Sequence, residues 1–448
     1  MVGQVQSTRD LEVPNFATGL PGRSGQPGAG RAIADDPIYD FNLPQGLPYA
    51  PPQVAPRSAY NLKLGSALVN FYASVQSIYT DNALQAPEGG DRQYDIRITP
   101  NLGASLAWQP NRNQSLRLDI GVGYQYSLQF SELNTLVFAP NSFLDYQFAL
   151  GDVTFTLFNA TSSGASTPPQ VVGQANNPGS IDFNRLGNNL GLRAAWTPYQ
   201  DLSFSGGYSF NINRGFNDAF AFQDLDQHGF NLGAFLRAHP QVTVGLSAGY
   251  SLFRFLESFQ NDLNSWSVGP VVSYSPSENL SLSAQVGYSV VDSQATGSLA
   301  DSSDFSGFTY GGSVTHRITR NLSHALSGGF GVQPGVGSNF SENYNLAYTL
   351  SARVTEDLGV TAGFAWTSFQ QSFTGLAVVA RLVNGVVILQ PLSLSTRAEF
   401  YLVNVGTSYQ ITPKLGSTLG YNYTWRASPV AAEEFTAHSV NLGLNYRF

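Results

Sequence analysis

The sequence contains no cysteine, which excludes disulfides and thiolate metal sites and suits a chain that crosses an oxidising compartment. Charged residues make up only 12%, about half the usual share. The net charge of -8 argues against a nucleic-acid partner. No run of about 18 apolar residues occurs, so we expect no membrane-spanning helix. The nearest candidate, residues 375–391, is interrupted by Arg381 and by Asn384-Gly385.

The amino-terminal residues MVGQVQSTRD also lack the apolar core of a signal peptide. Because Met1 is the only methionine, we expect that a start codon replaces a cleaved signal. Residues 1–58 hold nine of the 24 prolines and show neither helical nor strand periodicity, which predicts a disordered or extended segment that acts as an extension or linker. A plug or docking peptide remains open, and DDPIYDFNLP at 35–44 is its best candidate.

The rest of the chain is rich in glycine, with 45 residues, and in aromatic residues, which make up 13%. Apolar and polar residues alternate with a period of two. In LRLDIGVGYQYSLQF, 116–130, the even positions are apolar or aromatic and the odd positions are small, polar or charged. The closing stretch SVNLGLNYRF, 439–448, repeats this pattern. Such alternation predicts β-strands with one apolar face and one polar face.

Short turns containing Pro, Asn, Asp or Gly recur near residues 199, 240, 277, 320 and 357, at intervals of about 40. Each interval holds two long strands, so the repeating unit is a hairpin. We expect 18 strands, with 16 to 20 as the range, because a hairpin around Asn384-Gly385 would add two. The predicted strands are roughly 60–80, 92–108, 115–130, 140–149, 152–160, 183–197, 201–214, 221–238, 241–256, 259–276, 280–294, 305–318, 321–334, 340–355, 358–370, 394–411, 414–427 and 435–448.

The polar face consists mostly of Gly, Ser, Thr, Asn and Gln and has few lysines, unlike the wet face of a soluble sheet. Lipid outside and a watery or crowded lumen inside explain both faces, because a bilayer tolerates only helices and closed barrels. The fold is therefore predicted to be all-β, a closed antiparallel transmembrane β-barrel formed by residues 59–448. Outward aromatic residues should form two girdles. These are Tyr124, Tyr208, Tyr250, Tyr288, Trp366 and Tyr421 in one, and Trp108, Trp196, Tyr274, Tyr409, Tyr446 and Phe448 in the other.

With its alternating C-terminal strand ending in Phe448, its even strand count and its alternation of short turns and long loops, the chain resembles Gram-negative outer-membrane β-barrels, including porins and putative β-barrel porin families. The resemblance implies an outer-membrane location, both termini in the periplasm, and contact with outer-membrane lipid. It also implies that Tyr446 and Phe448 belong to a signal read by the barrel assembly machinery. A homo-oligomer is left open.

Catalytic chemistry has little support in the sequence. GLSAG, 245–249, matches the G-x-S-x-G pattern of hydrolases, but Ser247 falls in the middle of a predicted strand rather than at a strand-to-helix elbow. The five histidines show no metal-ligand spacing, and His316 and His324 fall at outward positions near the short turns. We expect no enzyme activity, no cofactor and no metal.

Arginine placement is the most informative feature for function. By parity, six arginines face the lumen near the short turns: Arg117, Arg193, Arg237, Arg317, Arg353 and Arg447. They either pair with neighbours such as Asp119 at a wet rim or form a basic annulus near the periplasmic mouth. Such an annulus would favour anions or hold the acidic Asp35-Asp36 segment. The favoured function is a porin-like channel for small solutes. The alternatives are a barrel component of polysaccharide or protein export and, further down, a barrel enzyme or adhesin.

Overall fold

The computed structural model describes residues 61–448 except 84, 88–89, 112, 139–141, 166–183, 217–220, 222–223, 336–337, 373–375, 384–385, 394–396 and 430–433. The predicted segment 1–58 and its candidate plug at 35–44 therefore lie outside the described residues. Within the described part, no helix has the length and apolarity needed to cross a membrane.

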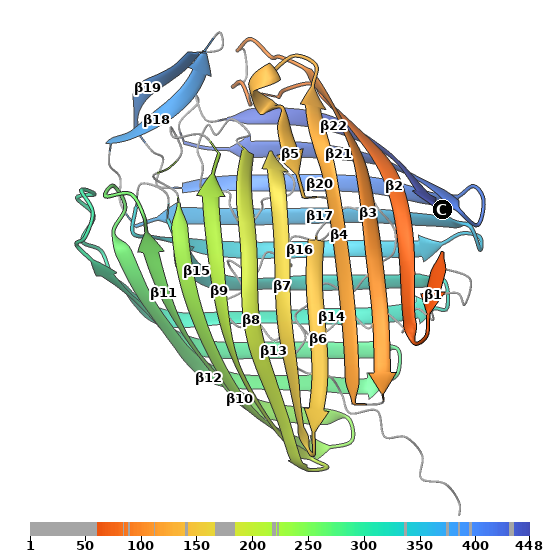
Figure 1. Cartoon of the computed structure of the whole chain (residues 1–448). Coiled ribbons are helices and arrows are strands. Elements are labelled where there is room, and N and C mark those ends of the chain that lie inside the picture. The colour runs from red at the N-terminus through yellow and green to blue at the C-terminus, as the bar shows by residue number, and fades with distance from the viewer. Residues whose placement is uncertain are drawn as a thin grey trace, which may run out of the picture.

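Antiparallel pairing links the strands into one sheet of twenty, of which the short β1 (Leu62–Leu64) and β5 (Thr135–Val137) only flank longer neighbours, leaving eighteen in the wall. Figure 1 shows these long strands side by side around the barrel. The wall strands are β2 (Ala67–Thr80), β3 (Asp95–Asn111), β4 (Gln114–Ser127), β6 (Ser142–Leu150), β7 (Val153–Ala165), β8 (Asn184–Tyr199), β9 (Leu202–Gly215), β10 (Leu225–His239), β11 (Val242–Phe255), β12 (Asp262–Ser277), β13 (Leu280–Gln294), β14 (Phe305–Thr319), β15 (Leu322–Pro334), β16 (Phe340–Arg353), β17 (Leu358–Gln371), β20 (Arg397–Gln410), β21 (Leu415–Ala427) and β22 (Phe435–Arg447).

The barrel closes where the last strand meets the first long one. β22 pairs with β2 from Tyr72 opposite Arg447 to Thr80 opposite Ser439, and β22 also pairs with β21. Both edges of the sheet are thereby hydrogen-bonded, as a lipid environment requires. The predicted closed antiparallel barrel of about 18 strands is confirmed.

The period-two alternation places apolar side chains on the outside. Leu102, Leu232 and Phe308 expose 66%, 68% and 67% of their surface there. All six aromatic residues of the second predicted girdle are also exposed, as are Tyr124, Tyr208, Tyr250, Tyr288 and Tyr421 of the first. This outer face meets lipid and needs no covering layer.

The short turns connect alternate strands at one end of the barrel, the short-turn rim, and the longer loops lie at the other end, the long-loop rim. Pro198, Pro276 and Pro413 all fall at the short-turn rim, since they lie at the ends of β8 and β12 and between β20 and β21. The buried apolar side chains gather toward the long-loop rim. One cluster contains Phe253, Leu263, Val291 and Phe340, and a second contains Phe369, Phe400 and Phe435.

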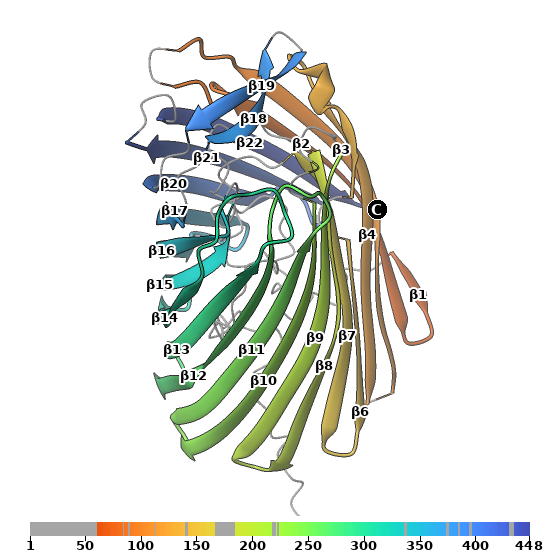
Figure 2. The same cartoon turned by 90° about the vertical axis from the view of Figure 1, so that its left-hand side faces the viewer.

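Two details differ from the sequence prediction, and a third resolves an alternative that the prediction left open. Residues 60–80 do not form one strand, because the chain turns at Gly65, whose φ of +61° suits glycine, and β1 folds back on β2. The loop after β4 contains a short helix η2 (Ser131–Leu133) and β5. β18 (Leu376–Val383) and β19 (Val386–Ser393) form the expected hairpin, but it pairs only with itself, so the wall keeps eighteen strands (Figure 2). Its Asn384-Gly385 turn lies outside the described residues.

Candidate functional site

The inner face of the wall is the candidate site, because most of its positions are small or polar apart from the two apolar clusters toward the long-loop rim. Alternation and register give the inward residues of each strand. On β9 they are Ser203, Ser205, Gly207, Ser209, Asn211 and Asn213. On β16 they are Ser341, Asn343, Asn345, Ala347, Thr349, Ser351 and Arg353. An 18-strand barrel is wide enough to enclose an aqueous path, and this lining is compatible with water.

Four of the six predicted arginines occupy the same place in the hairpin repeat. Each lies on a strand that runs to the short-turn rim and donates its backbone N–H to a carbonyl in the turn of the preceding hairpin. The pairs are Arg237 to Asp201 at 2.7 Å, Arg317 to Asn279 at 2.7 Å, Arg353 to Asn321 at 2.7 Å and Arg447 to Lys414 at 2.8 Å. We call these four residues the rim arginines.

The equivalent bond is made by Ala149, Thr197, Ser275 and Gln410 on other strands. The rim arginines thus share one structural level, and they are distributed along the sheet on β10, β14, β16 and β22. The Arg317 guanidinium also donates to Oδ1 of Asn279 at 2.6 Å and 2.8 Å, which holds it against the neighbouring turn.

Arg117 and Arg193 differ from the rim arginines, since they lie deeper in the wall and near carboxylates. Arg117 on β4 is directly opposite Asp145 on β6. Asp119 follows two residues later on the same face and accepts a 2.7 Å hydrogen bond from the Tyr72 hydroxyl. On β8 the Arg193 guanidinium carbon lies 4.2 Å from the centre of the Phe158 ring, which is a cation–π contact.

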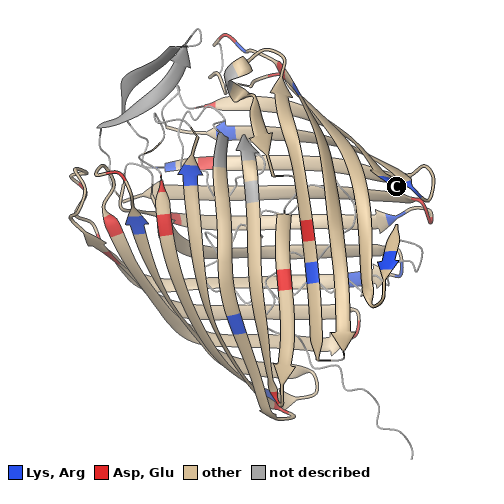
Figure 3. Ribbon diagram, in the orientation of Figure 1, with Lys and Arg blue, Asp and Glu red and all other residues tan. Residues whose placement is uncertain are grey.

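The inner face therefore divides into two arcs. On the mixed arc, β2–β8, the described inward side chains include Asp95, Asp119 and Asp145 as well as arginines. On the basic arc, β9–β17 with β20–β22, the described inward positions carry no Asp or Glu, although they include the rim arginines and the fully buried Arg426. Figure 3 shows how few charges the wall holds.

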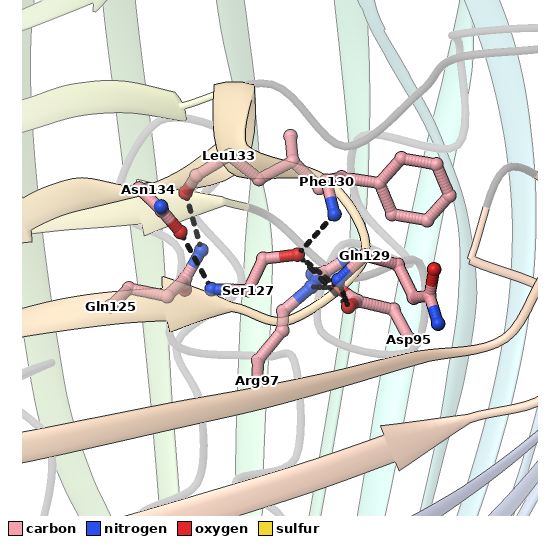
Figure 4. A network of polar contacts seen from close by, with 8 residues as sticks. All are labelled: Asp95, Arg97, Gln125, Ser127, Gln129, Phe130, Leu133 and Asn134. Atoms are coloured by element: carbon pink, nitrogen blue, oxygen red, sulfur yellow. Dashed lines mark hydrogen bonds and ion pairs between the residues drawn. The ribbon is translucent and has the colours of Figure 1, made fainter. Parts of the chain in front are cut away.

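A polar network near the long-loop rim was missed from the sequence. Asp95, which is fully buried, accepts hydrogen bonds from Arg97 Nε at 3.0 Å, from the Ser127 hydroxyl and from the Gln129 amide (Figure 4). Ser127 Oγ in turn accepts from the Phe130 amide at 3.0 Å. This network ties β3, β4 and the loop after β4 together. The alternation of DIRIT, 95–99, places Asp95 and Arg97 inward and could have revealed it.

The predicted assembly residues lie outside, at the short-turn rim. The rings of Tyr446 and Phe448 are both exposed and meet edge to face at 5.3 Å. The Phe448 amide donates to the Phe71 carbonyl at 3.2 Å, and the Asn61 side-chain amide donates to the Phe448 carbonyl. Backbone contacts thus fix the last residue to β2, and its ring remains available to lipid.

The residues considered for catalysis are in ordinary strand positions. Ser247 lies in the middle of β11 and donates to the Gly269 carbonyl at 3.4 Å, with no elbow. His316 and His324 do meet each other, at 3.2 Å between ring nitrogens. Within the described residues, no group of three His, Asp or Glu side chains could hold a metal ion.

Comparisons with known proteins give one family model and a set of solved structures. Residues 277–448 match the family model for the outer membrane protein beta-barrel domain. No curated protein matches the chain. Solved structures with a similar fold include the loop L8 deletion mutant of OmpT, an outer membrane protein of Vibrio cholerae, with 11% identity, 86% of this chain and 100% of that chain covered, and a TM-score of 0.38.

Two others are OpdQ of Pseudomonas aeruginosa, with 9% identity, 85% and 97% coverage and a TM-score of 0.46, and the F3-3 variant of the FrpB iron transporter of Neisseria meningitidis, with 11% identity, 85% and 81% coverage and a TM-score of 0.42. At these identities the likeness concerns the fold alone.

Proposed function

We propose that this chain, a porin-like β-barrel of the bacterial outer membrane, is a channel through which small solutes diffuse, with a preference for anions. The observation that carries the proposal is the charge distribution of the inner face. The rim arginines share one level on the basic arc, where the described inward positions hold no carboxylate. Rings of fixed charge near a pore mouth raise the local concentration of ions of opposite sign.

Carboxylates at the same rim lie in the turns rather than on the inner face. They are Asp152, Asp201, Glu278, Glu356 and Asp357. Because these turn residues stand in open solvent, salt screens them over roughly 8 to 10 Å. The inward arginines act on ions at the entrance itself. The wall therefore favours anions even though the whole chain has a net charge of -8.

Single-channel recording in a planar bilayer tests the proposal. We expect discrete conductance steps and, under a KCl gradient, a reversal potential displaced toward that of chloride. The triple variant Arg237→Ser, Arg317→Ser and Arg353→Ser should shift the potential toward cations. Arg320→Ser with Lys414→Ser removes cations from turns of the same rim and is the matched control. An unchanged potential in the triple variant, or an equal shift in the control, would contradict an anion-selective rim.

We also propose that the short-turn rim and both chain ends face the periplasm. The support is the barrel's own asymmetry, with short turns at one end and longer loops at the other. The absence of cysteine makes a clean test available. Asn321→Cys, in a short turn, should resist a membrane-impermeant maleimide on intact cells, whereas Ser298→Cys, in a loop at the other rim, should react. The reverse pattern would overturn this orientation.

A further inference from the structure

The outer surface of β12–β16 contains a hollow of about 340 Å³. Its floor is a row of small residues that lie side by side across three strands, Ala284, Gly312 and Gly328. Bulky rows border it on both sides along the strands. Toward the long-loop rim stand Tyr310, Phe330 and Tyr344, with ring centres 5.8 Å and 4.6 Å apart, and toward the short-turn rim stand Leu282, Val314 and Leu326. The hollow is thus an apolar groove on the lipid-facing side.

Polar groups stand next to this groove at the short-turn rim, one row beyond Val314 and Leu326. His316 and His324 are cross-strand partners there, and His316 Nδ1 lies 3.2 Å from His324 Nε2. Nδ1 of His324 is buried and has no hydrogen-bond partner. The pair leaves Nε2 of His316 for a ligand. Arg320, in the turn just beyond the pair, is exposed and makes no ion pair within the described residues.

The charges around Arg320 alternate in sign along the rim. The turn before it carries Glu278, and the turn after it carries Glu356 and Asp357. Adjacent hairpin turns are about 10 Å apart, because each strand spacing is about 4.8 Å. A basic centre between two acidic turns complements a headgroup that contains both a phosphate and a primary ammonium. A purely anionic headgroup would be repelled by the flanking carboxylates.

We propose that the groove retains one phospholipid of the phosphatidylethanolamine class. One acyl chain lies over Ala284, Gly312 and Gly328, between the aromatic row and the aliphatic row. The phosphate receives hydrogen bonds from Arg320 and from Nε2 of His316, and the ammonium reaches a carboxylate of a flanking turn. A second copy of the chain fits less well, since a stable interface needs about 800 Å² from each partner and this groove is only three small residues wide. The inference does not depend on channel activity.

Native mass spectrometry of the full chain, released from nanodiscs containing equal amounts of phosphatidylethanolamine, phosphatidylglycerol and phosphatidylcholine, tests the proposal. We expect one phosphatidylethanolamine retained per barrel. Ala284→Leu fills the groove without adding a new Cβ and should abolish retention. Ala248→Leu is the matched control, because Ala248 occupies an outward position of β11 beyond the groove.

The headgroup contacts are tested by Arg320→Gln combined with His316→Gln and His324→Gln. Because the phosphate is common to the three lipids, we expect the amount of bound phosphatidylethanolamine to fall roughly tenfold, the scale of one hydrogen bond to a charged group. Glu278→Gln combined with Glu356→Gln and Asp357→Asn removes the partners of the ammonium and should lower the ratio of bound phosphatidylethanolamine to phosphatidylcholine. His228→Gln with His438→Gln, outward histidines near the other rim, should leave both the amount and the ratio unchanged. Equal retention of the three lipids, or loss of an oligomer rather than of lipid in Ala284→Leu, would overturn the proposal. All variants are first confirmed as folded by heat-modifiable mobility.

Discussion

Arg117 on β4 and Asp145 on β6 lie directly opposite each other on the inner face of the barrel. Together with Asp119 and Arg193, this pair distinguishes the mixed arc of the lumen from the basic arc. Among the described residues, the inner face thus has carboxylates on one side only. Pore selectivity should accordingly respond to acidic and basic substitutions in opposite directions.

Asp119→Asn combined with Asp145→Asn should raise the preference for anions. The variant removes two of the three described inward carboxylates while every inward arginine stays in place. The reversal potential under a KCl gradient should move further toward that of chloride. Asp292→Asn, which removes an outward carboxylate from β13, is the control and should have no effect. A shift toward cations in the double variant would contradict the two-arc description.

Gly191→Ala should destabilise the barrel because it overpacks the inner face of the wall. A Cβ at Gly191 would lie 2.3 Å from the Phe158 ring and 2.5 Å from the Tyr208 carbonyl oxygen. The Phe158 ring, against which the Arg193 guanidinium packs, must therefore move. Overpacking of this kind costs about 1 to 3 kcal/mol. The temperature at which the heat-modifiable band disappears should fall. Gly331→Ala, where a Cβ would meet nothing within 4 Å, should be close to neutral, and an equal fall in both would refute the explanation.

Much of the fold could be predicted from the sequence, because a closed barrel in lipid imposes a period of two on every strand. That period predicts that Tyr124 lies on the outer face of the wall and Arg117 on the inner face. Residue order along one strand, however, does not give the register between strands. The placement of Asp145 opposite Arg117 depends on that register, and so does the common level of the rim arginines.

Loop structure was the least predictable part. The Asp95–Ser127 network and the turn at Gly65 depend on contacts between segments that share no simple periodicity. The hairpin at 376–391 was expected from an Asn-Gly pair, but its separation from the wall follows from pairing that a local motif does not specify. Arg97 and Arg426 also have inward parity, but they lie toward the long-loop rim and so fall outside the set predicted near the short turns.

Phe448→Ala should impair assembly in cells more than it lowers the stability of the finished barrel. The backbone bonds of Phe448 to Phe71 and Asn61 do not require its ring, which is 54% exposed to lipid. We expect less folded protein in the outer membrane but a nearly unchanged melting temperature after refolding. Tyr409→Ala removes an aromatic ring of similar exposure, 49%, from the same rim and should assemble normally. Equal losses would indicate a general girdle effect.

Deletion of residues 1–55 should leave a folded, heat-modifiable barrel. The described strands close through β2 and β22 without any residue before Ala67 in the wall. The deleted stretch also has too little apolar periodicity to offset its ordering entropy. Far-UV circular dichroism and gel mobility of the refolded variant are the measurements. Failure to refold would show that the segment forms part of the barrel interior.

Asp301→Asn should loosen together the loops that Asp301 joins at the long-loop rim. Asp301, in the loop between β13 and β14, accepts hydrogen bonds from the Asn339 amide at 2.7 Å, the Ser303 amide at 2.8 Å and the Ser372 hydroxyl at 2.7 Å. Asn261 donates to the Asp301 carbonyl at 2.9 Å, which adds the loop between β11 and β12. Hydrogen exchange should rise at 256–261, 295–304 and 338–339 in the variant.

The same carboxyl makes the effect depend on pH. Burial raises the pKa of Asp301, but the Asn339 amide, the Ser303 hydroxyl and amide and the Ser372 hydroxyl outweigh it, so the pKa lies below its usual 3.8. Because the pKa of Asp301 is lower in the folded state, the ionised carboxylate stabilises the loops at any pH above its usual pKa. This stabilisation is lost as the pH falls through the lowered pKa of the folded state. Protection in the wild type should therefore be constant from neutral pH to about pH 5 and decline below about pH 4.

Asp301→Asn should show little protection at any pH, whereas Asp304→Asn, which alters bonds only to Ser293, should keep the wild-type profile. Loop protection that persists in Asp301→Asn at neutral pH would assign the ordering of these loops to the adjacent apolar cluster instead.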